Sequence, residues 1–180
     1  MKYTIQKIIE KELEPRYIFF WGHQPSVDGS ITKSCLSQWW LSSFTVNGIE
    51  YKTAEHWMMA KKAELFGDKD TFQKIIKSDS PAVVKQFGRT VANYVDEEWN
   101  KYRYEIVKEG NYHKFSQHTD LRNFLINTDK QILVETSPTD AIWGIGMAID
   151  HKDIYKPDKW RGTNLLGFAL MEVRDQLKIN

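Results

Sequence analysis

A carboxylate and an amine stand in this sequence where a helix of a globular protein would carry apolar residues. The run from Tyr51 to Asp68 predicts a helix with Thr53 as its N-cap and Gly67 at its end. With about 100° between successive residues, one helix face is apolar and carries Met58, Met59, Ala63, Leu65 and Phe66. Glu55 and Lys62 fall near the middle of that face. Because burying two charges is costly unless they are paired or used, they indicate either a buried ion pair or the wall of a functional site.

Two structural interpretations compete with the functional one. Glu55 lies in the first turn, where a carboxylate interacts favourably with the helix dipole and can face water. Lys62 can lay its aliphatic stem on the apolar face and send its amine into solvent. Lys61 and Glu64 are expected on the opposite, solvated side. The helix alone therefore leaves the structural and functional interpretations open.

The rest of the sequence predicts the elements that position this helix. Strands are expected at 17–21 and 131–135, a hairpin at 44–51, and helices at 70–77, 80–87, 96–109, 118–127 and 163–177. Asn47-Gly48 suits a two-residue type I′ turn between the strands of the hairpin. Gly110 is expected to end the helix predicted at 96–109. Helices outnumber strands without alternating with them, which favours a predominantly helical α+β fold. We expect one compact domain over residues 1–180, with its core at about 17–178 and a small hairpin or sheet.

Composition excludes several classes of function. The 180 residues carry a net charge of +1, which gives no special argument for binding nucleic acid or a membrane. Cys35 is the only cysteine, and no apolar run approaches the ~20 residues of a membrane helix, so a cytoplasmic protein without a disulfide framework is expected. The sequence has no P-loop, G-x-G-x-x-G or G-x-S-x-G pattern. The scattered histidines predict no metal site.

Three further clusters contain residues that could bind a substrate. Arg103 shares a predicted helix face with Trp99, where it can stack on the ring or hold a phosphate or carboxylate. Asp140 follows Ser137 in a segment expected to start a helical turn, before the Trp143-Gly144 loop; a capped turn with a packed Trp is the alternative. Residues 159–167 form a basic, glycine-containing loop before a helix, suited to an anion unless it is merely solvated.

Ordered blocks over nearly the whole chain, from about Phe20 to Leu177, resemble the YbiA-like, or NADAR, family. The blocks are Phe20-Trp21, Leu36-Ser37-Gln38-Trp39, Tyr51-x-Thr-Ala-Glu55-His56-x-Met-x-Ala-x-Lys62, Gly88-Arg89, Trp99-x-x-x-Arg103, Lys114-Phe115-x-Gln117, Leu133-Val134-Glu135-x-Ser-Pro-x-Asp140-x-x-Trp143-Gly144 and Gly162-x-Asn164-x-x-Gly167-x-x-Leu170-Met171. No single block is diagnostic, whereas their order is a strong signal. Two positions depart from the family, since many relatives have Asn in place of Gln38 and some have Asp in place of Ile145.

The resemblance implies N-glycosidase activity, which cleaves the bond between C1′ of a ribose and a nitrogen, without a cofactor. The implied partner is a small nucleotide: a phosphoribosylamino-pyrimidine of riboflavin synthesis, or ADP-ribose, including ADP-ribose on guanine of a nucleic acid. The expected catalytic residues are Glu55, Lys62 and Asp140. The expected substrate-binding residues are Trp21, Gly22, Ser37, Gln38, Arg89, Trp99, Arg103, Lys114, Trp143, Gly144 and Asn164.

Two mechanisms are open for such a reaction. Glu55 or Asp140 can stabilise positive charge on the sugar ring and orient water. Alternatively, Lys62, with a pKa lowered by burial, can attack C1′ and form a Schiff base with the opened ribose. A non-catalytic ADP-ribose reader and a partner-binding domain are the alternatives outside enzymology.

Overall fold

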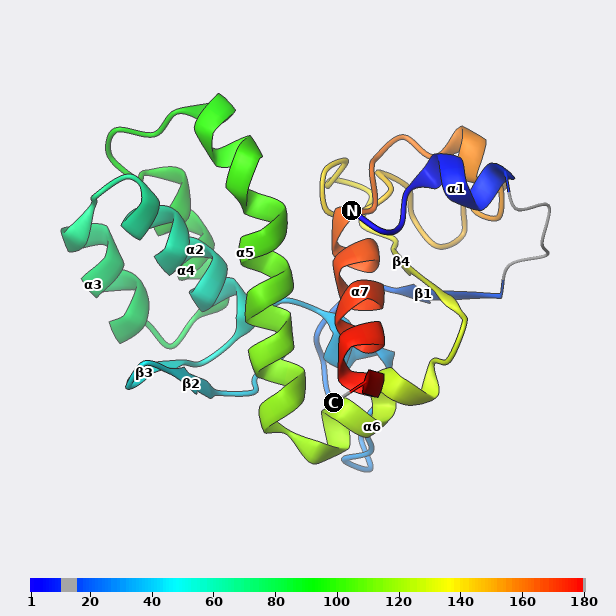
Figure 1. The fold of residues 1–180 in the computed structure, drawn as a ribbon, viewed down its shortest axis with the longest axis horizontal. Coiled ribbons are helices and arrows are strands. Elements are labelled where there is room, and N and C mark those ends of the chain that lie inside the picture. The colour runs from blue at the N-terminus through cyan, green and yellow to red at the C-terminus, as the bar shows by residue number, and fades with distance from the viewer. Residues whose placement is uncertain (11–15, 180) are drawn as a thin grey trace. The chain divides into compact units, whose positions relative to one another are not determined.

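The computed structural model describes residues 1–10 and 16–179, and the chain forms two compact units (Figure 1). Unit 1 comprises Met1–Ser37 and Thr119–Asn180, and unit 2 comprises Gln38–His118. Unit 2 is thus an insertion between two segments of unit 1. The predominantly helical α+β class expected from the sequence is confirmed, because the described residues form several helices and only two short sheets.

Unit 2 is built around one central helix. It contains β2 (Phe44–Val46), β3 (Ile49–Tyr51), α2 (Ala54–Leu65), α3 (Lys69–Lys77), α4 (Pro81–Arg89) and α5 (Asp96–Gln117). Helix α2 packs against α3, α4 and α5. The strands β2 and β3 form the predicted antiparallel hairpin, and positive φ angles of 50° at Asn47 and 79° at Gly48 match a type I′ turn.

Helix α2 begins and ends close to where the sequence predicts. The Thr53 side chain accepts a hydrogen bond from the backbone N–H of His56 and caps the helix. Gly67, with φ of 71°, follows the last turn, and the Asp68 N–H donates back to Ala63 O as in a Schellman motif. The prediction of one apolar face is wrong for the first half of α2, since every residue from Ala54 to Ala60 is buried. Packing against three helices leaves that half no solvated side.

Helix α5 corrects the prediction made at Gly110. It continues through this glycine to Gln117, so Gly110 does not end the helix. A Cβ atom at Gly110 would lie 2.3 Å from Cδ1 of Trp57. The Trp57 indole therefore packs directly on the α5 backbone and donates a 2.8 Å hydrogen bond from Nε1 to Ile106 O. Gly110 therefore lies inside the helix because a side chain there would collide with the Trp57 indole.

Unit 1 is organised by a two-stranded parallel sheet. Strand β1 (Tyr17–Phe20) pairs with β4 (Ile132–Glu135), both within one residue of the strands predicted from sequence. The other elements are α1 (Ile5–Glu10), α6 (Thr119–Asn127), α7 (Leu165–Ile179) and 3-10 turns at Lys33–Leu36 and Pro157–Lys159. Helix α7 packs on β4. One core cluster of unit 1 contains Phe19, Val134, Ile145, Met147, Ile154 and Trp160.

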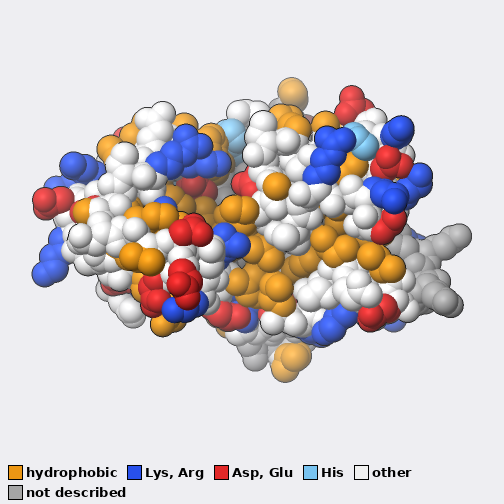
Figure 2. Space-filling model, turned by 90° about the horizontal axis from the view of Figure 1, so that it is seen from above, with side chains coloured by type: hydrophobic (Ala, Val, Ile, Leu, Met, Phe, Trp, Pro, Cys, Tyr) orange, Lys and Arg blue, Asp and Glu red, His pale blue; other side chains and the backbone are white. Residues whose placement is uncertain are grey.

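Charged side chains of both signs are interspersed over the face shown in Figure 2, in keeping with the small net charge. Within residues 1–10 and 16–179, none of the helices combines the length and apolar character needed to cross a bilayer.

Candidate active site

Glu55 is buried in the first turn of α2, with 3% of its surface exposed. The helix N-terminus is a favourable place for its carboxylate because the unpaired backbone N–H groups there carry partial positive charge. The backbone N–H of Glu55 donates a 3.0 Å hydrogen bond to Gln38 O, which fixes the segment before the hairpin against the start of α2. The interpretation of Glu55 as a solvated first-turn residue is therefore wrong.

Lys62 lies two turns further along α2, in an aromatic environment. Its Nζ donates a 2.7 Å hydrogen bond to Gly88 O and lies 4.0 Å from the Tyr94 ring centroid and 5.7 Å from that of Trp99. Burial lowers the pKa of the amine, while the negative charge of Asp96 opposes that shift. Among the described residues Lys62 forms no ion pair, so the Glu55–Lys62 pair considered from the sequence is not formed.

The partner of Lys62 depends on a glycine in α4. A Cβ atom at Gly88 would lie 1.8 Å from Sδ of Met59 on α2. The absence of a side chain lets α4 approach α2 and brings the Gly88 carbonyl within reach of Lys62. The Gly88-Arg89 block therefore includes a contact to a candidate catalytic amine.

Charged groups on and beside α5 lie near this amine. Tyr94 Oη donates a 2.7 Å hydrogen bond to Asp96 Oδ1, which lowers the pKa of Asp96, with smaller contributions from Arg103 and Lys62. Burial and the Asp96 hydrogen bond raise the pKa of Tyr94 to about 12. Trp99 is buried and Arg103 half-buried. The structure thus brings Lys62, Trp99 and Arg103 into one neighbourhood of unit 2, with Tyr94 as an additional member.

Asn111 is a polar residue of unit 2 that the sequence did not single out. It is fully buried on α5, where its Nδ2 donates to Val107 O at 2.8 Å and to Gln38 Oε1 at 3.1 Å. The Val107 carbonyl can only accept a hydrogen bond, so the Asn111 amide must turn its Nδ2 toward that carbonyl. The same Nδ2 donates to Gln38, so the Gln38 amide must turn its Oε1 toward Asn111. The Gln38 Oε1 is therefore used as an acceptor, which leaves its Nε2 as the donor side of the amide.

The other predicted residues of unit 2 differ in exposure. Arg89, the last residue of α4, is exposed, whereas Lys114 on α5 is fully buried. The Lys114 Nζ lies 5.0 Å from the Phe115 ring centroid. The exposed side chain of Arg89 can therefore reach a phosphate. Lys114, in contrast, is a cation in the interior of unit 2.

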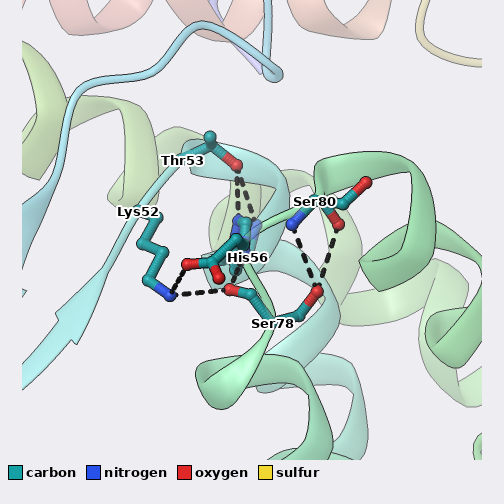
Figure 3. A network of polar contacts seen from close by, with 6 residues as sticks. Lys52, Thr53, His56, Ser78 and Ser80 are labelled. Carbon is teal, nitrogen blue, oxygen red and sulfur yellow. Dashed lines mark hydrogen bonds and ion pairs between the residues drawn. The ribbon is translucent and has the colours of Figure 1, made fainter.

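A polar network holds the start of α2 (Figure 3). His56 Nδ1 lies 2.8 Å from Thr53 Oγ1, and His56 Nε2 lies 3.1 Å from Ser78 O, which also accepts from Lys52 Nζ. The Ser78 carbonyl requires a proton on Nε2, so Nδ1 accepts from the threonine hydroxyl. Burial lowers the pKa of His56. This neutral imidazole ties the first turn, and hence Glu55, to the loop after α3.

The predicted residues of unit 1 follow the carboxyl ends of its two parallel strands. Trp21, 64% exposed, and Gly22, with φ of 82°, come directly after β1. The segment after β4 is joined to β1 where Thr136 N donates to Phe20 O at 2.9 Å. Ser37 is half-buried just after the first 3-10 turn. An exposed indole at the end of a strand offers a flat apolar surface for a ring.

Asp140 organises the loop that carries Trp143. Its Oδ1 accepts backbone hydrogen bonds from Ile142 at 2.9 Å and Trp143 at 2.8 Å. The helical turn predicted from Ser137 is absent, and the segment forms turns and bends. A Cβ at Gly144 would lie 2.8 Å from Glu135 O, so this glycine admits the β4 backbone. The two backbone hydrogen bonds accepted by Asp140 make this segment a turn capped by a side chain, which is the structural alternative considered from the sequence.

Asn164 is buried and uses its side chain on β4. Its Oδ1 accepts from Glu135 N at 3.0 Å, and its Nδ2 donates to Leu133 O at 2.9 Å. Its φ angle of 53° lies in the left-handed region, which asparagine adopts more readily than most residues. Glycines at 162 and 167 permit equally close contact, since a Cβ at Gly167 would lie 2.1 Å from Leu133 O. The side-chain amide thus continues the hydrogen bonding of the sheet.

The predicted residues fall into two groups. Unit 2 holds Gln38, Glu55, Lys62, Arg89, Trp99, Arg103 and Lys114. Unit 1 holds Trp21, Gly22, Ser37, Asp140, Trp143, Gly144 and Asn164. In the part of the chain that the structure describes, no three His, Cys, Asp or Glu side chains gather as metal ligands would.

Comparison with known proteins gives consistent matches. The NADAR domain family model matches residues 19–178. N-glycosidase R617 of Acanthamoeba polyphaga mimivirus is 40% identical over 166 residues, covering 89% of this chain and 96% of the viral protein. N-glycosidase YbiA of Escherichia coli K12 is 32% identical over 134 residues, or 74% of this chain and 75% of YbiA. The NMR structure of E. coli YbiA matches with a TM-score of 0.73 and 28% identity, over 93% of this chain and 88% of that one.

Proposed function

The chain belongs to the NADAR domain family and is an N-glycosidase, and we propose that it hydrolyses the C1′–N bond of a phosphorylated riboside. The substrate classes are ADP-ribosyl compounds, including ADP-ribosylated guanine, and the phosphoribosylamino-pyrimidines of riboflavin synthesis. The non-catalytic reader is set aside because curated relatives of this chain are named as N-glycosidases. Arg103 and the exposed Arg89 are proposed to hold the phosphate.

The observation that carries the mechanism is the environment of Lys62. Its amine is partly removed from water, faces two aromatic rings and has a pKa lowered by burial. Its hydrogen bond to Gly88 O holds Nζ in one direction. An amine nucleophile must be neutral, and desolvation raises the neutral fraction at a given pH. Lys62 is therefore proposed as the nucleophile.

The covalent route proceeds in balanced steps. Neutral Lys62 forms a bond to C1′ while the C1′–N bond to the base breaks, and the departing nitrogen takes one of the two Nζ protons. The ribose ring opens when its oxygen receives the proton from Nζ, which leaves an imine between Lys62 and C1′. Water adds to C1′, Nζ leaves, and the free sugar and the amine are regenerated. The net reaction is hydrolysis.

Glu55 is proposed to stabilise the positive charge that develops on the sugar. A buried carboxylate acts in a low-dielectric environment, where such stabilisation is stronger than in water. Asp140 is proposed to act through the loop it holds, because its Oδ1 already accepts two backbone hydrogen bonds. Trp143 and the exposed Trp21 are proposed to contact the base or the sugar.

Product analysis tests this function. Purified protein is incubated with ADP-ribosylated guanine, a phosphoribosylamino-pyrimidine and a free ADP-ribosyl compound, and the released base, amine or sugar is measured by mass spectrometry. Wild type is expected to release product from at least one substrate, with a strong loss in Lys62→Ala and Glu55→Gln. Lys61→Ala is the matched control, since Lys61 is the neighbouring lysine and pairs with Glu64 on the surface. No release from any of the three would contradict the proposal.

A further inference from the structure

Unit 1 contains a cavity that the proposed reaction does not use. It has a volume of about 1200 Å³, and every residue that lines it belongs to unit 1. Its walls come from the N-terminal segment with α1, the turn between α6 and β4, and the second half of α7. The volume exceeds the ~300–1,000 Å³ of common ligand pockets, so a nucleotide-sized molecule can be accommodated.

The cavity is strongly basic although the chain is nearly neutral. Its cationic residues are Lys2, Lys7, Arg16, Lys130, Arg174 and Lys178. Its carboxylates are Asp129 and Asp175, which pair with Lys178 and Lys2 respectively. Within residues 1–10 and 16–179, Lys7, Arg16 and Lys130 form no ion pair, and the six cations exceed the two carboxylates by four charges. The cavity therefore carries a net positive charge that favours an anion.

Arg174 is the unusual member of this group. Only 2% of its surface is exposed, and its Nε is buried without a hydrogen-bond partner. Its Nη1 donates to Thr128 Oγ1 and to Gln131 O, both at 2.8 Å. These two neutral acceptors hold the turn before β4, and the carboxylates of Asp175 and Asp129 act electrostatically on the guanidinium. Arg174 is therefore a buried cation whose charge is partly compensated, and an anion in the adjoining cavity would add to that compensation.

The wall formed by α1 is anchored to the rest of unit 1. Ile5 and Ile8 pack against the core cluster of Phe19, Val134 and Trp160. Lys7 Nζ donates to Lys2 O at 2.9 Å, and Tyr3 Oη donates to Asp175 Oδ2 at 2.7 Å. These contacts tie the N-terminal segment to itself and to α7, so the cavity is bounded by packed elements.

We propose that this cavity is a second anion site, which binds a small molecule carrying a pyrophosphate group. A pyrophosphate presents several charged oxygens over a short distance, matching a cavity whose lining has an excess of four positive charges. Lys7, Arg16 and Lys130 would contact the oxygens of the pyrophosphate, and the buried Arg174 would contribute its positive charge at the wall of the cavity. Tyr3, Ile8 and Met171 line the same cavity and can contact an attached nucleoside. None of the residues that line this cavity is among those proposed for catalysis or substrate binding.

Isothermal titration calorimetry with pyrophosphate, ADP and inorganic phosphate tests the site. The double variant Lys7→Glu/Lys130→Glu reverses two charges in the cavity, and Lys33→Glu/Lys152→Glu reverses two exposed charges of unit 1 outside it. The cavity variant is expected to bind pyrophosphate and ADP at least about tenfold more weakly than wild type, and the control variant within about twofold. Inorganic phosphate is expected to bind more weakly than pyrophosphate to wild type.

Two further variants separate this site from the catalytic one. Arg174→Met, checked for folding by circular dichroism, is expected to lose pyrophosphate binding, and Arg174→Lys to recover part of it. Lys62→Ala is expected to keep pyrophosphate binding while losing N-glycosidase activity. The inference is overturned if wild type shows no saturable pyrophosphate binding. It is equally overturned if the cavity and control variants bind alike, or if binding is lost in Lys62→Ala and kept in the cavity variant.

Discussion

The Nζ atom of Lys62 lies 4.0 Å from the centroid of the Tyr94 ring and donates a hydrogen bond to the carbonyl of Gly88. The three residues come from α2, from α4 and from the segment before α5. A lysine so placed is partly removed from water, and its pKa is lowered by that burial. The reactivity proposed for the chain depends on this arrangement.

The first prediction concerns the pH dependence of the reaction. Because burial lowers the pKa of Lys62 below its ordinary value of 10.5, the neutral amine becomes abundant at a lower pH than for an exposed lysine. We expect kcat/KM to rise with pH through the lowered pKa and then to level off. A rate profile that is flat over that range, with product release intact, would contradict a nucleophilic Lys62.

The second prediction concerns Gly88. Alanine there would place a Cβ atom 1.8 Å from Met59 Sδ, so either the Met59 side chain must move or α4 must shift with the carbonyl that Lys62 binds. Gly88→Ala is expected to lower the free energy of unfolding by about 1–3 kcal/mol, as overpacking does, and to lower activity. Gly88→Ala/Met59→Ala removes the clash and is expected to be more stable than the sum of the single effects predicts. Additive effects in chemical denaturation would count against this contact.

The third prediction concerns Asn111 as a positioning residue. Aspartate at 111 cannot donate to Val107 O or to Gln38 Oε1, so the Gln38 amide loses its fixed orientation. Asn111→Asp is expected to raise KM more than it lowers kcat, if Gln38 Nε2 donates to the substrate. Asn123→Asp, an exposed Asn→Asp change on α6, serves as the control. Equal changes in KM for the two variants would show that Asn111 has only a structural role.

The fourth prediction concerns stability in acid. Burial lowers the pKa of His56 in the folded state, so the unfolded chain binds a proton more readily. The stabilisation is fully present above the unfolded pKa of about 6.5 and is lost as pH falls through the folded pKa. The melting temperature of wild type is expected to drop over this range more steeply than that of His56→Gln. Parallel curves would mean that His56 does not contribute.

The fifth prediction separates two roles for Asp140. Asparagine keeps an oxygen that can accept from Ile142 N and Trp143 N, whereas alanine removes it. If Asp140 acts by holding the loop, Asp140→Asn retains most activity and Asp140→Ala loses it. Equal and severe loss in both variants would instead assign the negative charge itself a role in catalysis.

Local signals were sufficient for much of the fold. Asn47-Gly48 predicts its hairpin because few residues adopt two successive positive φ angles, and Thr53 predicts the start of α2 because a cap is a local interaction. The prediction that Gly110 ends a helix was wrong because a glycine that ends a helix and one that accommodates a tryptophan ring are the same in sequence. The ring belongs to Trp57, more than fifty residues earlier.

The candidate site was predictable in part, for a similar reason. Spacing marked Glu55 and Lys62 as unusual, but only tertiary packing decides that one is buried and the other faces aromatic rings. Asn111 was missed because its partners, Val107 and Gln38, come from its own helix and from a distant loop. Asn164 matched a family block, and its contacts with β4 give it a structural use that spacing does not reveal.

Borohydride trapping tests the covalent role of Lys62 most directly. Wild type is incubated with a turned-over substrate and sodium borohydride, digested, and analysed by peptide mass spectrometry. The account predicts a substrate-dependent adduct of the reduced sugar on Lys62, absent from Lys62→Ala and unchanged in Lys61→Ala. Full turnover by Lys62→Ala, or an adduct on another residue while Lys62 stays unmodified, would contradict it.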